Sequence, residues 1–213
     1  MSGEAGAAAL SGRRRVVVLR HGQTGHNAAG IWQGHLDSDL SELGEEQARA
    51  AGAALAAYRP SLVVASDLKR AAETGAAVAD EAGLALRVDA RWREMHVGRW
   101  EGLTADEVSA QYPEDRRRHF AGEDFKRGVD GESLSEVVER VHGAVTDLLA
   151  ELAPGRTAVV ATHGVTARVV VSELVGLDLP TTWRVLGGFG NCHWADVVET
   201  VSGWRIQTWN ASA

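Results

Sequence analysis

The sequence predicts an α/β fold with parallel strands, because two apolar runs end in the same way. Residues 16–20 lead directly into His21, residues 157–162 lead into His163, and a glycine follows each histidine. Each run has the length and composition of a strand buried on both faces, and a helix-compatible segment follows it. In open α/β sheets, ligands bind in the crevice at the carboxyl ends of such strands. We therefore expect both imidazoles to face one crevice.

Helices and strands alternate along the rest of the chain. After the strand at 16–20, the expected elements are a helix at about 41–57, a strand at 62–65, a helix from about 66 to 83, a short strand at 86–88, a helix at about 131–152, the strand at 157–162, a helix at 165–175 and a hairpin of residues 194–199 and 204–209. Short apolar runs predict the strands, and helical spacing of apolar residues predicts the helices.

Local signals justify the helix boundaries. Ser41 offers a hydroxyl cap to the first helix, and Ser66 with Asp67 caps the second, which Gly83 ends. This assignment places Arg70 in the first turn of its helix, close to the preceding strand end. The long helix is amphipathic through Leu134, Val137, Val138, Val141, Val145, Leu148, Leu149 and Leu152.

The composition indicates one globular domain, since the 213 residues are 45% hydrophobic and 24% charged. We expect residues 1–14 to be a disordered tail and residues 15–213 a single domain, with a charged cap segment at about 103–130. The net charge of −7 and the scattered basic residues argue against nucleic acid or a membrane as partner. The single cysteine, Cys192, and the lack of a long apolar run predict a cytoplasmic protein. A homodimer is one candidate assembly.

Histidines and arginines at strand ends suit phosphoryl transfer. A neutral imidazole attacks phosphorus, while guanidinium groups hold the phosphoryl oxygens and disfavour the imidazolium form. Arg20 and Arg70 would supply these guanidinium groups. His163 and the neutral donor Asn27 would complete the phosphate-binding set.

The leaving alkoxide also needs a proton, and Glu94 is the best carboxyl candidate for this general acid. It lies in a loop-like segment with tryptophans on both sides, at 91–102. A metal site is the other functional interpretation of the eight histidines, but no His-x-x-x-His or His-Glu pattern of ligand type is present. We therefore expect no metal and no other cofactor.

Four segments, in this order, resemble those of a known family. Residues 19–24 with Asn27, residues 66–74, residues 93–102 and residues 162–164 are similar to the motifs of the histidine phosphatase superfamily, also called the phosphoglycerate mutase-like fold. The resemblance covers nearly all of the chain from residue 16 to residue 209. It implies a three-layer α/β/α sandwich with a mainly parallel central sheet.

The resemblance also implies a role for each site residue. His21 would be the phosphorylated nucleophile and Glu94 the proton donor. The phosphate-binding residues would be Arg20, Asn27, Arg70 and His163. Gln33 is carried over as a further substrate contact, and Gln23 and Thr24 are candidate contacts beside it. Apart from the resemblance, the cap is basic within an acidic protein, so Arg117 and Arg118, with Arg116, Lys126 and Arg127, are expected to reach a second anionic group of the substrate.

Within the superfamily, the chain resembles the actinobacterial glucosyl-3-phosphoglycerate phosphatase branch through residues 33–37, 40–44, 187–191 and 209–213. This resemblance implies a phosphomonoesterase that hydrolyses a small phosphorylated metabolite through a phosphohistidine intermediate, with glucosyl-3-phosphoglycerate as the candidate substrate. The partner is therefore a small phosphate ester.

Two alternatives stay open. A cofactor-dependent phosphoglycerate mutase shares the catalytic residues, but mutases of this family usually carry Glu-Ser where this chain has Gln23 and Thr24. A catalytically silent interaction module on the same fold is disfavoured because every expected catalytic residue is present.

Overall fold

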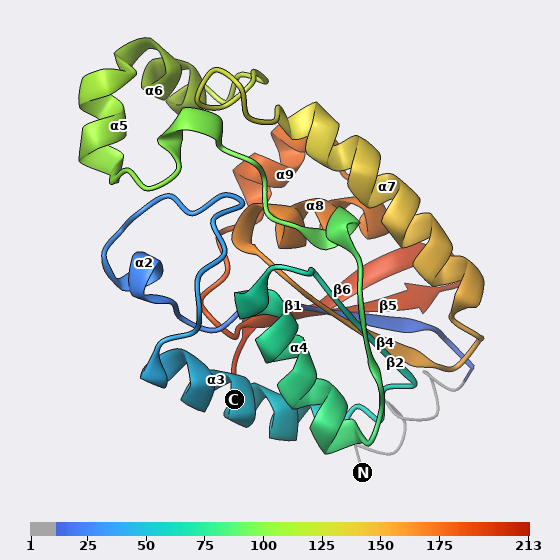
Figure 1. Cartoon of the computed structure of the whole chain (residues 1–213). Coiled ribbons are helices and arrows are strands. Elements are labelled where there is room, and N and C mark those ends of the chain that lie inside the picture. The colour runs from blue at the N-terminus through green and yellow to red at the C-terminus, as the bar shows by residue number, and fades with distance from the viewer. Residues whose placement is uncertain (1–11) are drawn as a thin grey trace.

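The computed structural model describes residues 12–213, and a mixed sheet of six strands forms its centre (Figure 1). The strand order is β3-β2-β4-β1-β5-β6. The strands are β1 (Arg15–Arg20), β2 (Leu62–Ala65), β3 (Leu86–Val88), β4 (Thr157–Thr162), β5 (Trp194–Thr200) and β6 (Gly203–Ala211). The first four strands are mutually parallel, β5 runs antiparallel to β1, and β6 runs antiparallel to β5. The predicted hairpin and the mainly parallel sheet are confirmed.

The helices of the described residues lie between these strands in the chain. They are α2 (Gly25–Ala28), α3 (Glu42–Ala56), α4 (Lys69–Ala82), α5 (Ala105–Gln111), α6 (Pro113–Phe120), α7 (Leu134–Glu151), α8 (Gly164–Val175) and α9 (Leu179–Val185). Two single turns of 3-10 helix, Ala90–Trp92 and Gly98–Trp100, interrupt the loop before α5. No helix within residues 12–213 has both the length and the apolar character needed to cross a membrane.

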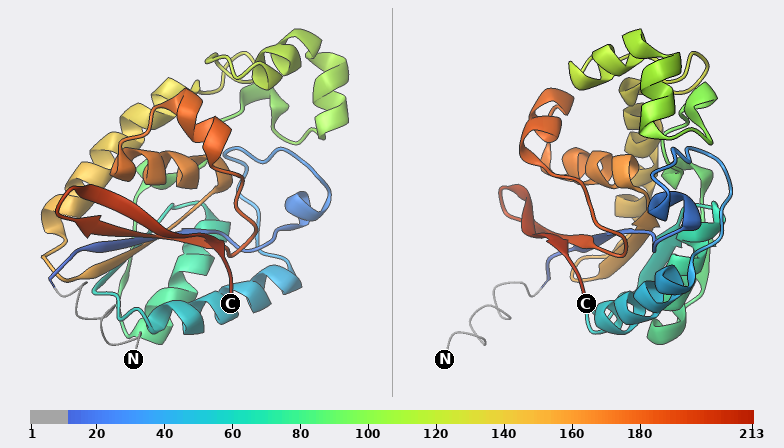
Figure 2. Two further views of the ribbon diagram at one scale, coloured as in Figure 1. Left: turned by 180° about the vertical axis from the view of Figure 1, so that it is seen from behind. Right: turned by 90° about the vertical axis from the view of Figure 1, so that its left-hand side faces the viewer.

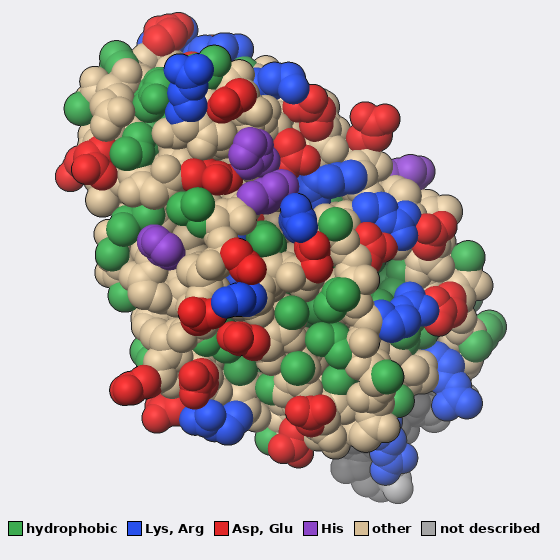
Figure 3. All heavy atoms as spheres, in the orientation of Figure 1, with side chains coloured by type: hydrophobic (Ala, Val, Ile, Leu, Met, Phe, Trp, Pro, Cys, Tyr) green, Lys and Arg blue, Asp and Glu red, His purple; other side chains and the backbone are tan. Residues whose placement is uncertain are grey.

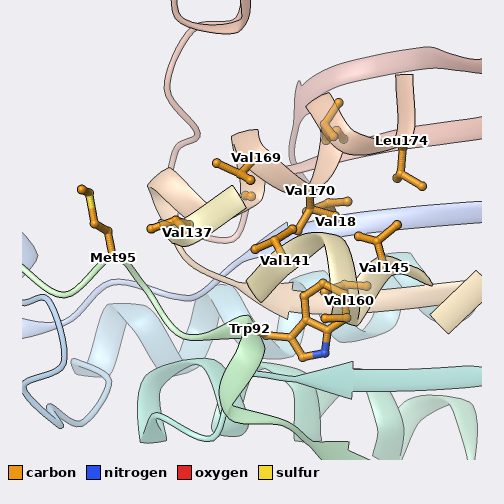
Figure 4. Close-up of a cluster of buried hydrophobic side chains, with 14 of the residues drawn as sticks. Val18, Trp92, Met95, Val137, Val141, Val145, Val160, Val169, Val170 and Leu174 are labelled. Carbon is orange, nitrogen blue, oxygen red and sulfur yellow. The ribbon is translucent and has the colours of Figure 1, made fainter. Parts of the chain in front are cut away.

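Both faces of the sheet are covered, as the apolar runs predict. In β1, Val17 and Leu19 belong to one buried cluster, which α3 and α4 complete. Val16 and Val18 belong to the other, which includes side chains of α7 and α8. Figure 2 shows the sheet between these two helical layers, and Figure 4 shows the second cluster in detail. The three-layer sandwich is confirmed, and the strands at its centre are held rigidly by packing on both sides.

The register of the two central strands brings the histidines together. Arg20 pairs with Thr162 across the β1–β4 ladder, so His21 and His163 follow paired residues of parallel strands. The backbone N–H of His21 donates to the Thr162 carbonyl at 2.9 Å. The expected juxtaposition at the carboxyl edge of the sheet is therefore present.

The structure differs from expectation near the N-terminus and in the cap. Of the expected tail at 1–14, residues 1–11 lie outside the described residues, whereas the Arg14 side chain donates to Glu199 and to the Leu149 carbonyl. No helix was expected in the charged cap segment at about 103–130, but it contains α5 and α6, which stand apart from the sheet (Figure 1). Helix α6 buries none of its residues, so no apolar periodicity in the sequence indicates it.

Candidate active site

A cavity of about 480 Å³ opens at the carboxyl edge of the sheet, where β1 ends. It lies between the loop after β1, the start of α8 and the segment that leads to α5 and α6. The sequence-predicted residues that line it are Arg20, His21, Asn27, Gln33, Arg70 and Glu94. His163 does not line the cavity and is fully buried behind His21, with 5.1 Å between the two ring centroids.

One backbone carbonyl fixes the tautomer of His21. The Nδ1 atom lies 2.7 Å from the Gly22 carbonyl oxygen, which can only accept, so Nδ1 carries the proton and Nε2 has the free lone pair. Burial lowers the pKa of His21 well below its usual value, and the charges of Arg70 and Arg20 lower it further. The imidazole is therefore neutral near pH 7, as a nucleophile must be.

The glycine after His21 is required by close packing. A Cβ atom on Gly22 would lie 2.5 Å from the carbonyl oxygen of Gly44, and a Cβ on Gly44 would lie 2.0 Å from the carbonyl oxygen of Gln23. The first turn of α3 thus presses against the backbone that carries His21. This contact fixes the nucleophile relative to the sheet.

His163 is a buried imidazole with no hydrogen-bond partner among the described residues on either ring nitrogen. Burial lowers its pKa well below the usual value, with further contributions from Arg70 and His21. A neutral ring in this position has one donor and one acceptor unused. Buried polar groups are normally satisfied, so this ring is suited to contact a bound ligand or the phosphorylated form of its neighbour.

The two arginines combine anchored and free donors. Arg70 donates from Nη1 to the Leu36 carbonyl at 2.7 Å and from Nη2 to the Gly34 carbonyl at 2.8 Å. Arg20 donates from Nη1 to the Phe189 carbonyl. In both side chains Nε is buried without a partner in the described chain. Carbonyl contacts hold the guanidinium groups in place without neutralising them, so their charge remains available for phosphoryl oxygens.

Asn27 is oriented by the capping box of α2. Its Oδ1 accepts from the Thr24 backbone N–H at 3.1 Å and from Asn191 Nδ2 at 3.2 Å, which leaves its own amide N–H₂ as a donor at the cavity. Thr24 caps the helix and donates from Oγ1 to Oε1 of Gln33 at 3.0 Å. Gln33 lines the cavity, and its oxygen is occupied, so its amide N–H₂ is the group left for a ligand.

Glu94 is fixed at the N-terminus of α8. Its Oε1 accepts from the backbone N–H groups of Met95 at 2.9 Å and Thr166 at 3.2 Å, and its Oε2 accepts from Val165 N–H at 3.1 Å. This network holds the Glu94 carboxyl group at the cavity. The sequence does not indicate these backbone contacts.

Four of the tentative substrate contacts do not line the cavity. Gln23 accepts from Ser41 Oγ at 3.0 Å at the start of α3, and Thr24 is buried as a helix cap. Arg117 pairs with Glu114, three residues before it in α6, and Arg118 pairs with Glu123. Acidic side chains of the cap therefore pair with the two arginines that were expected to contact a substrate.

Other residues line the cavity that sequence reasoning missed or did not single out. They are Arg168 of α8, Trp183 of α9 and His119 of the cap, whereas Arg127, a cap cation expected over the crevice, also lines it. Arg168 interrupts an otherwise apolar run in its helix, and this interruption is the one sequence signal for it. In the part of the chain that the structure describes, no group of three or more His, Cys, Asp or Glu side chains is placed to hold a metal ion.

Comparison with known proteins gives the family. The model of the histidine phosphatase superfamily (branch 1) matches residues 16–212, nearly the whole described chain. The chain belongs to the histidine phosphatase superfamily. The predicted family is thus confirmed.

Relatives within the superfamily are similar over nearly their whole length. The glucosyl-3-phosphoglycerate phosphatase of Mycolicibacterium vanbaalenii is 41% identical, over 94% of this chain and 96% of the relative. A "probable phosphoglycerate mutase" of Erwinia tasmaniensis is 33% identical, over 92% of this chain and 89% of the relative. Among solved structures, a mycobacterial glucosyl-3-phosphoglycerate phosphatase in complex with VO3 has a TM-score of 0.85 and 39% identity, covering 93% of this chain and all of that one.

Proposed function

We propose that this superfamily member is a phosphomonoesterase that works through a phosphohistidine on His21. The observation that carries the proposal is the neutral His21 ring, whose Nδ1–H is bound to the Gly22 carbonyl and whose Nε2 is left free at the cavity. The match to the superfamily supports the same reaction class. Phosphoryl transfer requires chiefly positioning and charge stabilisation, which the surrounding donors supply.

In the proposed first step, the Nε2 lone pair forms a bond to phosphorus and the bond to the ester oxygen breaks. Arg20, Arg70 and Asn27 stabilise the phosphoryl oxygens, and the free ring N–H of His163 donates the fourth contact. Glu94 gives a proton to the leaving alkoxide. In the second step, Glu94 takes a proton from water, the water oxygen attacks phosphorus, and the P–N bond breaks to release inorganic phosphate and restore His21.

The proposed substrate is glucosyl-3-phosphoglycerate, because relatives of this name share about 40% of the sequence over nearly the full length. The cavity volume of about 480 Å³ suits a ligand of this size. The proposed setting is the cytoplasm. The proposed reaction needs no metal, because guanidinium groups already offset the phosphate charge, and EDTA should leave the rate unchanged.

Mutase activity is the second candidate, since a relative named as a probable mutase is 33% identical to this chain. The two activities differ in the fate of the phosphoryl group. A phosphatase releases inorganic phosphate, whereas a mutase returns the group to a bound acid. Assays of phosphoglycerate with and without 2,3-bisphosphoglycerate separate them, and Gln23 and Thr24 favour release.

The decisive experiment is a rapid alkaline quench with labelled substrate, followed by measurement of acid-labile label on the protein. We expect the wild type to carry label on His21 and to release phosphate, and His21→Ala to do neither. Absence of labelled protein during rapid turnover, together with substantial hydrolysis by His21→Ala, contradicts the proposal.

A further inference from the structure

We propose that Arg168 binds a second anionic group of the substrate, a carboxylate that lies near the phosphate ester. This inference rests on the proposed phosphatase function and deepens it, because it assigns a specificity-determining residue to the same cavity. Arg117 and Arg118 were expected to reach such a group, but neither lines the cavity, whereas Arg168 does.

The hydrogen bonding of Arg168 sets it apart from its neighbours. Four arginines line the cavity, and three of them donate to backbone carbonyls: Arg20, Arg70 and Arg127. The Arg168 side chain has no hydrogen bond or ion pair with any residue that the structure describes, and its Nε is buried. A charged group withdrawn from water is normally paired, because the cost of desolvation is large otherwise. An anionic ligand would supply the missing partner.

An aromatic ring orients the guanidinium. The Arg168 Cζ atom lies 4.2 Å from the centroid of the Trp183 ring, at stacking distance. Contact over the flat face restricts the guanidinium plane and leaves the in-plane N–H groups as the route to a partner. Such an edge matches the two oxygens of a carboxylate, which a guanidinium binds in a bidentate manner. A planar carboxylate is therefore the chemistry that the site fits best.

The position of Arg168 relates it to the phosphoryl site. It lies one helical turn after Gly164 in α8, and both residues line the cavity with Glu94. Burial lowers the pKa of Arg168, while the nearby charge of Glu94 opposes this shift and that of Arg20 adds to it. Because Arg20 and Arg168 line the same cavity, a phosphate at Arg20 and a carboxylate at Arg168 would belong to one small molecule.

The remaining basic groups at this end of the cavity do not replace Arg168. Burial lowers the pKa of His119 to about 4, with Arg127, Arg116 and Arg168 adding to the effect, so His119 is neutral near pH 7. Arg127 already donates to the carbonyl of Phe125 and stacks on its ring. Arg168 is thus the arginine of the cavity lining whose side-chain N–H groups have no partner in the described part of the chain.

The test compares two compounds that differ in one group. Glycerate 3-phosphate carries a carboxylate where glycerol 3-phosphate carries a hydroxymethyl group, and the phosphate ester is the same in both. For Arg168→Gln, we expect kcat/KM on the carboxylate compound to fall about tenfold or more, mainly through KM, since charged hydrogen bonds have about this effect. Turnover of glycerol 3-phosphate should stay within about twofold of the wild type.

Two further variants control for charge and folding. Arg184→Gln removes the same charge from the exposed residue next to Trp183 and should leave both substrates unaffected. Arg168→Lys keeps a charge without the planar fork and should lose part of the preference for the carboxylate compound. If Arg168→Gln does not fold, Arg168→Lys decides alone, and an unchanged preference in it overturns the proposal.

Calorimetry separates this proposal from the proposed function. Binding of both compounds is measured to His21→Ala and to the double variant His21→Ala with Arg168→Gln, which requires no turnover. A preference for the carboxylate compound that the second change removes supports Arg168 even where the wild type hydrolyses neither compound. Equal dissociation constants for the two compounds, or a preference that survives the change, overturns the assignment of Arg168 and leaves the phosphohistidine mechanism untouched.

Discussion

At the scale of single residues, the chemistry depends on which atoms are already occupied. The Gly22 carbonyl binds Nδ1 of His21, the Thr24 backbone binds Oδ1 of Asn27, and each contact leaves one free atom at the cavity. Glu94 differs, because three backbone N–H groups bind its two oxygens before any substrate arrives. Its carboxyl group is therefore held in place in the free enzyme, and proton transfer to the ester oxygen depends on such a fixed position.

Replacing Glu94 tests this role. Glu94→Gln should slow hydrolysis of alkyl phosphates much more than that of aryl phosphates, by roughly tenfold or more. A nitrophenolate leaves with little help from an acid, whereas a sugar or glycerol alkoxide needs a proton. The measurement is kcat/KM for glycerol 3-phosphate and p-nitrophenyl phosphate with both proteins. Equal losses on the two substrates would instead indicate a role in binding or in the position of α8.

Much of the site could be predicted residue by residue, and the rest could not for a physical reason. Arg20, His21, Arg70 and Glu94 lie in local motifs, and a motif fixes both residue type and backbone geometry. The direction of the Arg168 side chain depends on how α8 is rotated against α9. A sequence pattern does not contain that rotation, so only the interruption of the apolar run could have drawn attention to Arg168.

At the scale of elements, the helices and strands that bury an apolar face are the ones that the sequence predicts correctly. The strands and α7 could be predicted because their apolar residues follow the period of the element, as α7 shows with Val137, Val141, Ala144 and Leu148 all buried. Helices α5 and α6 pack chiefly against each other and the cap, and only Val108 in them is buried. Without a buried face, their capping signals alone distinguish them from a loop.

The packing of α3 against the nucleophile loop gives a prediction at this scale. Gly44→Ala should destabilise the protein by about 1–3 kcal/mol, because its Cβ would overlap the Gln23 carbonyl oxygen. It should also reduce turnover, since relief of the overlap moves the backbone next to His21. Urea unfolding and kcat on glycerol 3-phosphate measure the two effects.

Gly143→Ala is the matched control. It lies inside α7, and a Cβ there would meet only Arg91 Nη1 at 3.7 Å. The same substitution should therefore stabilise the protein by about 0.5–1 kcal/mol, because alanine has the higher helix propensity. If Gly44→Ala and Gly143→Ala change the free energy of unfolding in the same direction, the close approach of Gly44 to the Gln23 carbonyl is not the reason that glycine is needed at position 44.

At the scale of the whole molecule, charges of both signs are mixed over the surface, as the face in Figure 3 shows, and the basic groups of the cavity lie inside. The cavity therefore concentrates positive charge within an acidic protein of net charge −7. Such an arrangement draws an anionic substrate to one place. The same inward placement of cations keeps the buried histidines neutral, and it makes the folded protein less stable at acidic pH.

The lowered histidine pKa values predict how the stability of the protein depends on pH. The pKa values of His21, His163 and His119 are all lowered in the folded state, by burial first and by arginine charges second. Below about pH 6.5 the unfolded chain binds protons that the folded chain does not, so stability falls as the pH falls. Each such histidine contributes at most about 1.4 kcal/mol per pH unit. The carboxylates whose pKa is lowered add their loss only in more acidic solution.

Urea unfolding at about pH 7.5, 6.5 and 5.5 measures this dependence. The wild type should lose stability between the two lower values, and His119→Phe should lose less, by up to about 1.4 kcal/mol, because one buried titrating group is gone. Phenylalanine preserves the edge contacts that His119 makes with Trp32 and Trp100. The matched control is His142→Gln, on the exposed side of α7, which leaves the buried set intact. A His119→Phe protein with the full acid loss of the wild type would show that His119 is not held neutral by its surroundings.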